Sequence, residues 1–245
     1  EIGSGLVGSE MCIRDRFKAL FKNDQAMTVV VSIILVYTSL NICGNLVLYF
    51  FRFDVGNEGA YSIFAAVAFA AQVLVMMVIP LLRKRFSKSQ LFISGFIIQI
   101  AGFAVILIMA FAKLYTPQSW YILCLPGILI YLGYGMLNVI MTIFLSDSVD
   151  YGEVMNGTRE ESVIFSMQTF TVKLASGVAV FLAGLVVDWI HLDTAAAVQT
   201  QDTLDALRMW MTIPSVILLI VGIFVFKRFY KLDDTRMEEI KSKLN

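Results

Sequence analysis

The chain has 245 residues, and its 19 basic and 19 acidic side chains give a formal net charge of zero. Apolar residues make up 58% of the chain and charged residues only 16%, and the charges gather between long apolar runs. This composition excludes an ordinary soluble domain, and no basic, aromatic-interleaved patch indicates nucleic-acid binding.

The first sixteen residues do not resemble the start of a membrane protein. Position 1 is not a methionine, and Met11–Arg16 lacks the apolar core of a signal peptide. The string Val7–Arg16 resembles a translated sequencing adapter. We therefore expect residues 1–16 to be a non-native leader outside the fold; the alternative is a true cytoplasmic leader.

Six apolar runs follow, and each is predicted to cross a membrane as a helix, which takes about 20 apolar residues. The runs do not alternate as barrel strands do, so helices must satisfy their backbone groups in lipid. The predicted spans are Ala26–Phe51, Ala60–Leu82, Leu91–Ala112, Trp120–Phe144, Phe165–Ile190 and Met209–Phe226. The prediction is an all-α membrane protein with a six-helix bundle over residues 17–226 and a tail over 227–245.

Basic residues predict the orientation of the bundle, because cytoplasmic loops carry an excess of Lys and Arg. The segment Arg83–Lys88 and the tail from Lys227 are rich in them, whereas the opposite side carries only Arg52, Lys113 and Arg208. Both termini are therefore expected in the cytoplasm. We interpret Arg83–Lys88 as a topology determinant that can touch lipid headgroups, and the helix expected from Met237 as solvated.

Polar residues mark one face of the first and fourth spans, whereas the third and sixth are almost wholly apolar. Two three-helix units of inverted topology would give this pattern, with their first helices lining a shared cavity. The alternative is that these side chains only hydrogen-bond helix to helix. The two stripes are Tyr37, Asn41, Asn45 and Tyr49, and Tyr131, Tyr134, Asn138 and Thr142.

Lys173 lies inside the fifth apolar run, close to Gln168 and Thr169. In a span that begins near Ser162 it lies about 11 residues in, roughly 16 Å deep, near the middle of a hydrocarbon core about 30 Å thick. A charged side chain there is costly unless it meets a polar cavity or a partner, so Lys173 is predicted to be functional. The alternative is that it snorkels to the cytoplasmic interface.

One block resembles a known family of carriers. Asp147-Ser-Val-Asp-Tyr-Gly-Glu153, Gly157-Thr-Arg-Glu-Glu161, Phe165-Ser-Met-Gln-Thr-Phe170 and Lys173 are similar to the segment after the tenth helix of the glycoside–pentoside–hexuronide:cation symporters of the major facilitator superfamily. Members of that family have twelve helices in two bundles, with a sugar site between them. The resemblance implies that this chain is the C-terminal six-helix half and that its partner is a missing N-terminal bundle.

The resemblance also implies roles for particular residues. The expected substrate-binding residues, taken with the polar stripes, are Lys173, Gln168, Thr169, Asn138, Tyr37 and Asn41. Asp147, Asp150, Glu153 and Arg159, on a segment expected to be a loop, are predicted to form a cytoplasmic gate whose charges pair across the bundle interface; the alternative is a solvated acidic loop. A coupling cation, Na⁺, Li⁺ or H⁺, is expected mainly in the missing half, and we expect no other cofactor and no metal site.

The resulting hypothesis is a fragment of a secondary active transporter of the cell inner membrane that couples sugar uptake to a cation by alternating access. Its expected partners are the sugar, the cation and membrane lipid. It is not expected to be an enzyme, because no nucleophilic triad, phosphate loop or metal cluster is present. The alternatives are a major facilitator carrier for another solute and a complete six-helix scaffold protein.

Overall fold

The computed structural model describes residues 22–157, 159 and 161–244, so the leader predicted for residues 1–16 lies outside the described part. This part consists of helices and connecting segments without a strand. Six helices are long and apolar enough to cross a membrane, which confirms the predicted fold class. In chain order the helices are α2 (Asp24–Tyr49, continued by a π-helical turn over Phe50–Val55), α3 (Ala60–Leu82), α4 (Lys88–Phe111), α5 (Cys124–Asn156, preceded by a 3₁₀ turn over Trp120–Leu123), α6 (Glu161–Trp189), α7 (Gln201–Phe229) and α8 (Asp234–Leu244).

Two helices extend well beyond the predicted spans. α5 continues to Asn156, where Gly157 ends it in the left-handed conformation (φ 71°). The acidic residues from Asp147 onward therefore lie on a helix, and the prediction of a loop from Asp147 is wrong for this stretch. α7 begins at Gln201 because the side chain of Thr200 caps it by accepting a hydrogen bond from the backbone N–H of Thr203.

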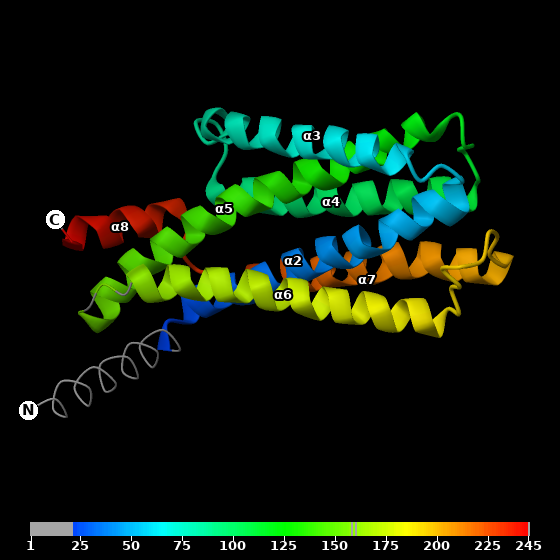
Figure 1. The fold of residues 1–245 in the computed structure, drawn as a ribbon. Coiled ribbons are helices and arrows are strands. Elements are labelled where there is room, and N and C mark those ends of the chain that lie inside the picture. Colours follow the sequence, from blue (N-terminus) through cyan, green and yellow to red (C-terminus); the bar gives the residue numbers. More distant parts are fainter. Residues whose placement is uncertain (1–21, 158, 160, 245) are drawn as a thin grey trace, which may run out of the picture.

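The helices pack in a pattern that is symmetric between the first three spans and the last three. α2 packs against α6 and α7, and α5 packs against α3 and α4, while α4 meets α7 and α2 meets α5 at the centre. Exchanging α2, α3 and α4 for α5, α6 and α7 interchanges the first four of these pairs and converts each of the two central pairs into itself. The inverted repeat predicted from the polar stripes is thus present in the packing of the bundle (Figure 1).

Small residues bring α4 and α5 together at the centre of the bundle. A Cβ added at Gly133 would lie 2.6 Å from the backbone nitrogen of Gln99 and from the carbonyl oxygen of Gly95. At Gly102 an added Cβ would lie 2.7 Å from the backbone nitrogen of Ile130. Close helix approach through glycine is the usual way in which membrane helices gain packing contacts.

α8 is packed on one face rather than solvated all round. Met237 and Ile240 are buried with Leu232, and the side chains packed against this cluster include Tyr151 and Val154 on the extended end of α5. Figure 1 shows α8 beside this end of α5, at the same end of the bundle as the start of α2. The apolar face of the helix, which repeats every three to four residues, explains the packing.

Candidate functional site

The polar stripes of α2 and α5 face each other. The side-chain amide of Asn138 donates a hydrogen bond of 2.7 Å to the phenol oxygen of Tyr37. The ring of Tyr37 stands edge-on to that of Tyr134, with centroids 5.5 Å apart and an angle of 75° between the planes. Tyr37 and Asn138 are half-buried. The two helices that come first in each three-helix unit therefore meet through phenol and amide groups.

Two asparagines continue the α2 stripe toward the C-terminal end of the helix. Asn41 donates its amide N–H to the carbonyl oxygen of Tyr37, and Asn45 donates in the same way to Asn41, each at 2.7 Å. Both side chains are half-buried and lie along the helix. Each amide oxygen is left to accept hydrogen bonds from a hydroxyl group.

A hollow of about 480 Å³ opens beside Asn138, between α3, α5 and α6. Gln168 on α6 reaches across toward α5, with its amide nitrogen 3.5 Å from the hydroxyl of Thr142, at the outer limit of a hydrogen bond. The hollow is lined by Met76, Asn138, Val139, Thr142, Ile143, Ser146 and Phe165.

The exposed surface of α6 divides into two sectors at helical spacing. The buried face of α6, from Ile164 to Val186, includes Ala175 and Ala179 and packs against α2. One exposed sector is large and apolar and suits lipid; its members are Phe170, Leu174, Val178, Phe181 and Leu185. The other exposed sector, the polar sector of α6, carries Ser162, Ser166, Thr169, Lys173, Gly177 and Gly184, with the apolar Val180 between the two glycines.

Lys173 thus lies on the polar sector of α6 and not on the apolar one. Thr169, one turn before it, donates its hydroxyl to the carbonyl oxygen of Phe165 at 3.2 Å, and Phe165 lines the hollow beside Asn138. Among the described residues no carboxylate forms an ion pair with Lys173. The structure therefore joins Tyr37 to Asn138 and brings Gln168 to Thr142, one turn further along α5, whereas the side chain of Lys173 is exposed on the polar sector of α6 and takes part in neither contact.

Arg159 holds together the end of α5 and the start of α6. Its guanidinium donates to Asp150 at 3.1 Å, to Glu153 at 2.9 Å and to Glu161 at 3.1 Å. Hydrogen bonds to Glu153, Glu161 and Asp150 raise the pKa of Arg159 above its usual value, so the group stays charged. Three of the residues predicted to form a gate are thus in contact, on a surface where the Arg159 side chain is 48% exposed.

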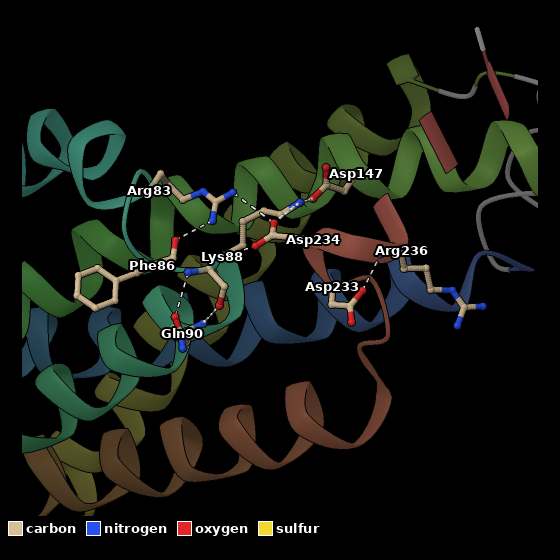
Figure 2. Close-up of polar contacts among 9 residues, drawn as sticks. Arg83, Phe86, Lys88, Gln90, Asp147, Asp233, Asp234 and Arg236 are labelled. Carbon is tan, nitrogen blue, oxygen red and sulfur yellow. Dashed lines mark hydrogen bonds and ion pairs between the residues drawn. The ribbon is translucent and has the colours of Figure 1, made fainter. Parts of the chain in front are cut away.

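Asp147, the fourth predicted gating residue, makes a different contact. Its carboxylate pairs with the ammonium of Lys88 at 2.5 Å, inside the bundle, and Asp234 of the segment after α7 lies 3.3 Å from the same ammonium (Figure 2). Arg83 reaches the same Asp234 carboxylate at 3.3 Å. The Lys88 side chain is only 8% exposed, so this member of the segment interpreted as a topology determinant is buried. The helical continuation of α5 places Asp147 against the start of α4, which a loop would not have done.

Sequence reasoning missed a second buried network at the opposite end of the bundle. Arg208 of α7 donates through Nε to Asp54 at 2.8 Å, and both side chains are 3% exposed. The phenol of Tyr115 donates to the same carboxylate at 2.5 Å, and Arg208 also reaches Asp205 at 2.7 Å. From the sequence we interpret Arg208 only as a charge on the outer side. The signal for this network in the sequence is that an acidic residue, Asp54, and a basic residue, Arg208, lie at the ends of two apolar runs.

Comparison with known proteins agrees with this architecture. The family model of the MFS/sugar transport proteins matches residues 7–234. The chain is 25% identical over 228 residues to the uncharacterized symporter YjmB of Bacillus subtilis, covering 93% of this chain and 48% of that protein. It is 23% identical over 234 residues to the raffinose carrier protein of Pediococcus pentosaceus (95% of this chain, 35% of that protein).

A third relative is the isoprimeverose transporter of Lactiplantibacillus pentosus, 25% identical over 223 residues (90% of this chain, 44% of that protein). The chain therefore spans about half the length, or less, of these relatives. The family consists of carriers, which confirms the prediction that the chain is not an enzyme. With the matched model covering nearly all of the chain, this protein belongs to the MFS/sugar transport protein family, as a multi-pass membrane protein.

Proposed function

We propose that this chain is the C-terminal half of a twelve-helix symporter that couples uptake of a sugar to Na⁺, Li⁺ or H⁺ by alternating access. The missing N-terminal bundle would complete the sugar site and would hold most of the cation site. Both termini of this half would be cytoplasmic, in the cell inner membrane, as the distribution of basic residues predicts. The relatives named as sugar carriers, and the share of their length that the chain covers, support the proposal.

The observation that carries the proposal is the polar sector of α6 beside the phenol–amide contact of α2 and α5. A lipid-facing surface has no use for Ser166, Thr169 and Lys173, whereas a water-filled cavity between two bundles does. Phe165 of α6 lines the hollow beside Asn138, whereas Ser166, Thr169 and Lys173 are exposed on the polar sector of the same helix, so a cavity that includes them needs a partner on that side. A second bundle facing α2, α5 and α6 would close the cavity.

Exposed glycines on the same helices support a second bundle at this face. Gly44 of α2 and Gly177 and Gly184 of α6 have no neighbouring heavy atom within 4 Å of the place where a Cβ would lie. Glycine inside a helix costs stability relative to alanine, and in membrane helices small residues permit close approach of a partner helix. Helices of the missing half packed against α2 and α6 would explain these three glycines.

The side chains at this face suit a sugar. A sugar offers many hydroxyl groups and no charge, so its site needs amides, a phenol and an aromatic surface within one cavity. Asn41, Asn138 and Gln168 supply amides, and Tyr37 supplies a phenol ring. Lys173 has three N–H donors, which would bind sugar hydroxyls and a carboxylate of the missing bundle, and this pairing would offset the cost of its charge in the membrane.

The test is Lys173→Gln in the full-length carrier, with Lys227→Gln as the control. Lys227 is an exposed lysine in the last turn of α7, at the cytoplasmic end in our proposal, so its neutralisation removes one positive charge without touching the cavity. Uptake of radiolabelled sugar should fall by about tenfold or more in Lys173→Gln at equal membrane expression, and the control should retain its uptake. Unchanged uptake in Lys173→Gln would contradict the proposed role.

A further inference from the structure

Two buried cations lie at opposite ends of the bundle, and each is paired with a buried carboxylate. At one end, Lys88 at the start of α4 pairs with Asp147 near the end of α5 (Figure 2). At the other end, Arg208 in the first turns of α7 pairs with Asp54, in the π-helical turn that ends α2. Side-chain exposure is 8% and 6% in the first pair and 3% in both members of the second. In Figure 1 α4 and α7 begin toward opposite ends of the bundle.

The two pairs are related by the inverted repeat of the fold. Each cation is in the first part of the third helix of one three-helix unit: Lys88 is the first residue of α4, and Arg208 lies two turns into α7. Each carboxylate is in the last part of the first helix of the other unit: Asp147 lies in the last third of α5, and Asp54 in the turn that ends α2. A third residue joins each pair from the segment after the third helix of a unit: Asp234, the first residue of α8, contacts the cation Lys88, and Tyr115, after α4, contacts the carboxylate Asp54. The exchange of units that maps the helix packing onto itself therefore relates the two charge pairs by their helices, but the third partner contacts the cation in one network and the carboxylate in the other.

Burial decides what such a pair can do during a conformational cycle. Separating a buried pair leaves a charge without a partner and without water, so a buried pair opposes separation far more than an exposed one. The exposed contacts of Arg159 with Asp150, Glu153 and Glu161 are of the weaker kind, which can break and reform. The difference in burial therefore divides the charged residues of this half into contacts that stay closed and contacts that can change.

We propose that Lys88–Asp147 and Arg208–Asp54 are a matched pair of positioning clamps that stay closed throughout transport. They would fix the inner end of α5 to α4 and the outer end of α2 to α7, so that both cavity-lining helices keep their place within the bundle. The half would then move as one body against the missing half. This inference rests on the proposed function, and it assigns to Asp147 a contact within its own bundle in place of a gate across the interface.

The test replaces each pair by a covalent bridge in the full-length carrier. One protein carries Asp54→Cys with Arg208→Cys, the other Lys88→Cys with Asp147→Cys, and the native cysteines are replaced in both. A reducible bis-methanethiosulfonate reagent, a few atoms long, joins the two thiols, because pairs of long side chains span more than the Cα separation that a disulfide accepts. A protease site introduced between the two positions makes the bridge visible on a gel, and a third protein with Asp150→Cys and Arg159→Cys serves as the control for reactivity.

Clamps that stay closed predict that both proteins become bridged and that the bridged carriers retain about half or more of the uptake of the reduced carriers, because no step of the cycle opens the contact. Two results would overturn the proposal. One is uptake that disappears on bridging and returns on reduction. The other is a pair that does not bridge while the control pair does. A carrier that transports no sugar before any substitution would instead refute the proposed function.

Neutral substitutions decide the matter if a paired-cysteine protein does not reach the membrane. Arg208→Gln should lower the amount of folded carrier by about tenfold or more, because it leaves Asp54 buried without a cation. Asp54→Asn should lower it less, because Arg208 keeps Asp205 as a partner. The two changes together should recover most of the folded carrier and of its uptake. Lys88→Gln and Asp147→Asn should behave in the same way. Double variants that fold no better than the single ones, or that fold and do not transport, would overturn the clamps.

Discussion

The contact between α4 and α5 predicts that Gly133→Ala destabilises the protein. The added Cβ would lie 2.6 Å from backbone atoms of Gln99 and Gly95, whereas ordinary contacts begin at 3.4 Å, so the two helices must separate by most of an ångström. Overpacking of this kind costs about 1–3 kcal/mol. Because the added Cβ meets two backbone atoms, the cost lies in the upper half of this range, about 2–3 kcal/mol. Alanine is favoured over glycine in a helix by ~1 kcal/mol, which leaves a net loss of roughly 1–2 kcal/mol. In thermal unfolding of the detergent-purified protein this corresponds to a Tm lowered by roughly 2–8 °C.

A second glycine of α5 provides the matched control. At Gly127 the added Cβ would lie 2.4 Å from the ring of Phe64, a side chain of α3, and not from backbone. Gly127→Ala should therefore be rescued by Phe64→Leu, which vacates the ring position. Gly133→Ala should not be rescued by Gln99→Ala, because the backbone of α4 stays in place. A Gly133→Ala protein with a Tm equal to or above that of the parent would refute the reasoning.

Three further predictions concern charges and a helix cap at the end of the bundle where α8 lies. Arg159→Gln should lower the rate of sugar uptake more than it lowers the affinity for sugar. Its Tm should be almost unchanged, because exposed ion pairs contribute only about 0–1 kcal/mol to stability. Normal turnover in this variant would favour a solvated segment without a gating role. Burial raises the pKa of Asp234, but Lys88 and Arg83 outweigh it and hold that pKa below its usual value. We therefore expect α8 to stay docked from about pH 5 to 8 and to loosen only as acid protonates Asp234. The measurement is the mobility of a spin label attached at Glu238→Cys, and loosening near neutral pH would contradict the prediction. Ser87→Ala removes the capping box of α4 and should cost about 1 kcal/mol, measured as Tm, while Ser89→Ala should not.

Much of the fold followed from hydrophobic runs, because membrane helices need long apolar segments. The span Ala60–Leu82 agrees with α3 at both ends. The fourth and sixth spans were predicted too short, since hydropathy marks where lipid is and not where a helix ends. α5 continues past Phe144 as a polar helix that packs against α8, and the first turns of α7 carry Asp205 and Arg208, which hydropathy assigned to a loop.

The candidate site was predictable in part. The spacing of polar residues indicated that α2 and α5 share a polar face, and the structure joins Tyr37 to Asn138. The depth of Lys173 in the membrane could be estimated from its place in the fifth apolar run. The direction in which its side chain points could not, because that depends on which side of α6 packs against α2. The roles of Lys173, Gln168 and Thr169 in binding sugar stay predictions, as do the gating roles of Asp150, Glu153 and Arg159.

The buried pairs were beyond sequence reasoning for a physical reason. Lys88 and Arg208 were counted as topology charges, because a basic residue at the end of an apolar run is usually exposed to water. Their partners, Asp147 and Asp54, are distant in sequence, and the two pairs use different cations and share no motif. Only the packing of α4 on α5 and of α7 on α2 brings each cation to its carboxylate, and that packing repeats by inversion. A symmetry that repeats a charge pair between corresponding helices while changing its residues points to a constraint on the bundle itself, which is that each of its two cavity-lining helices must be held to a neighbouring helix.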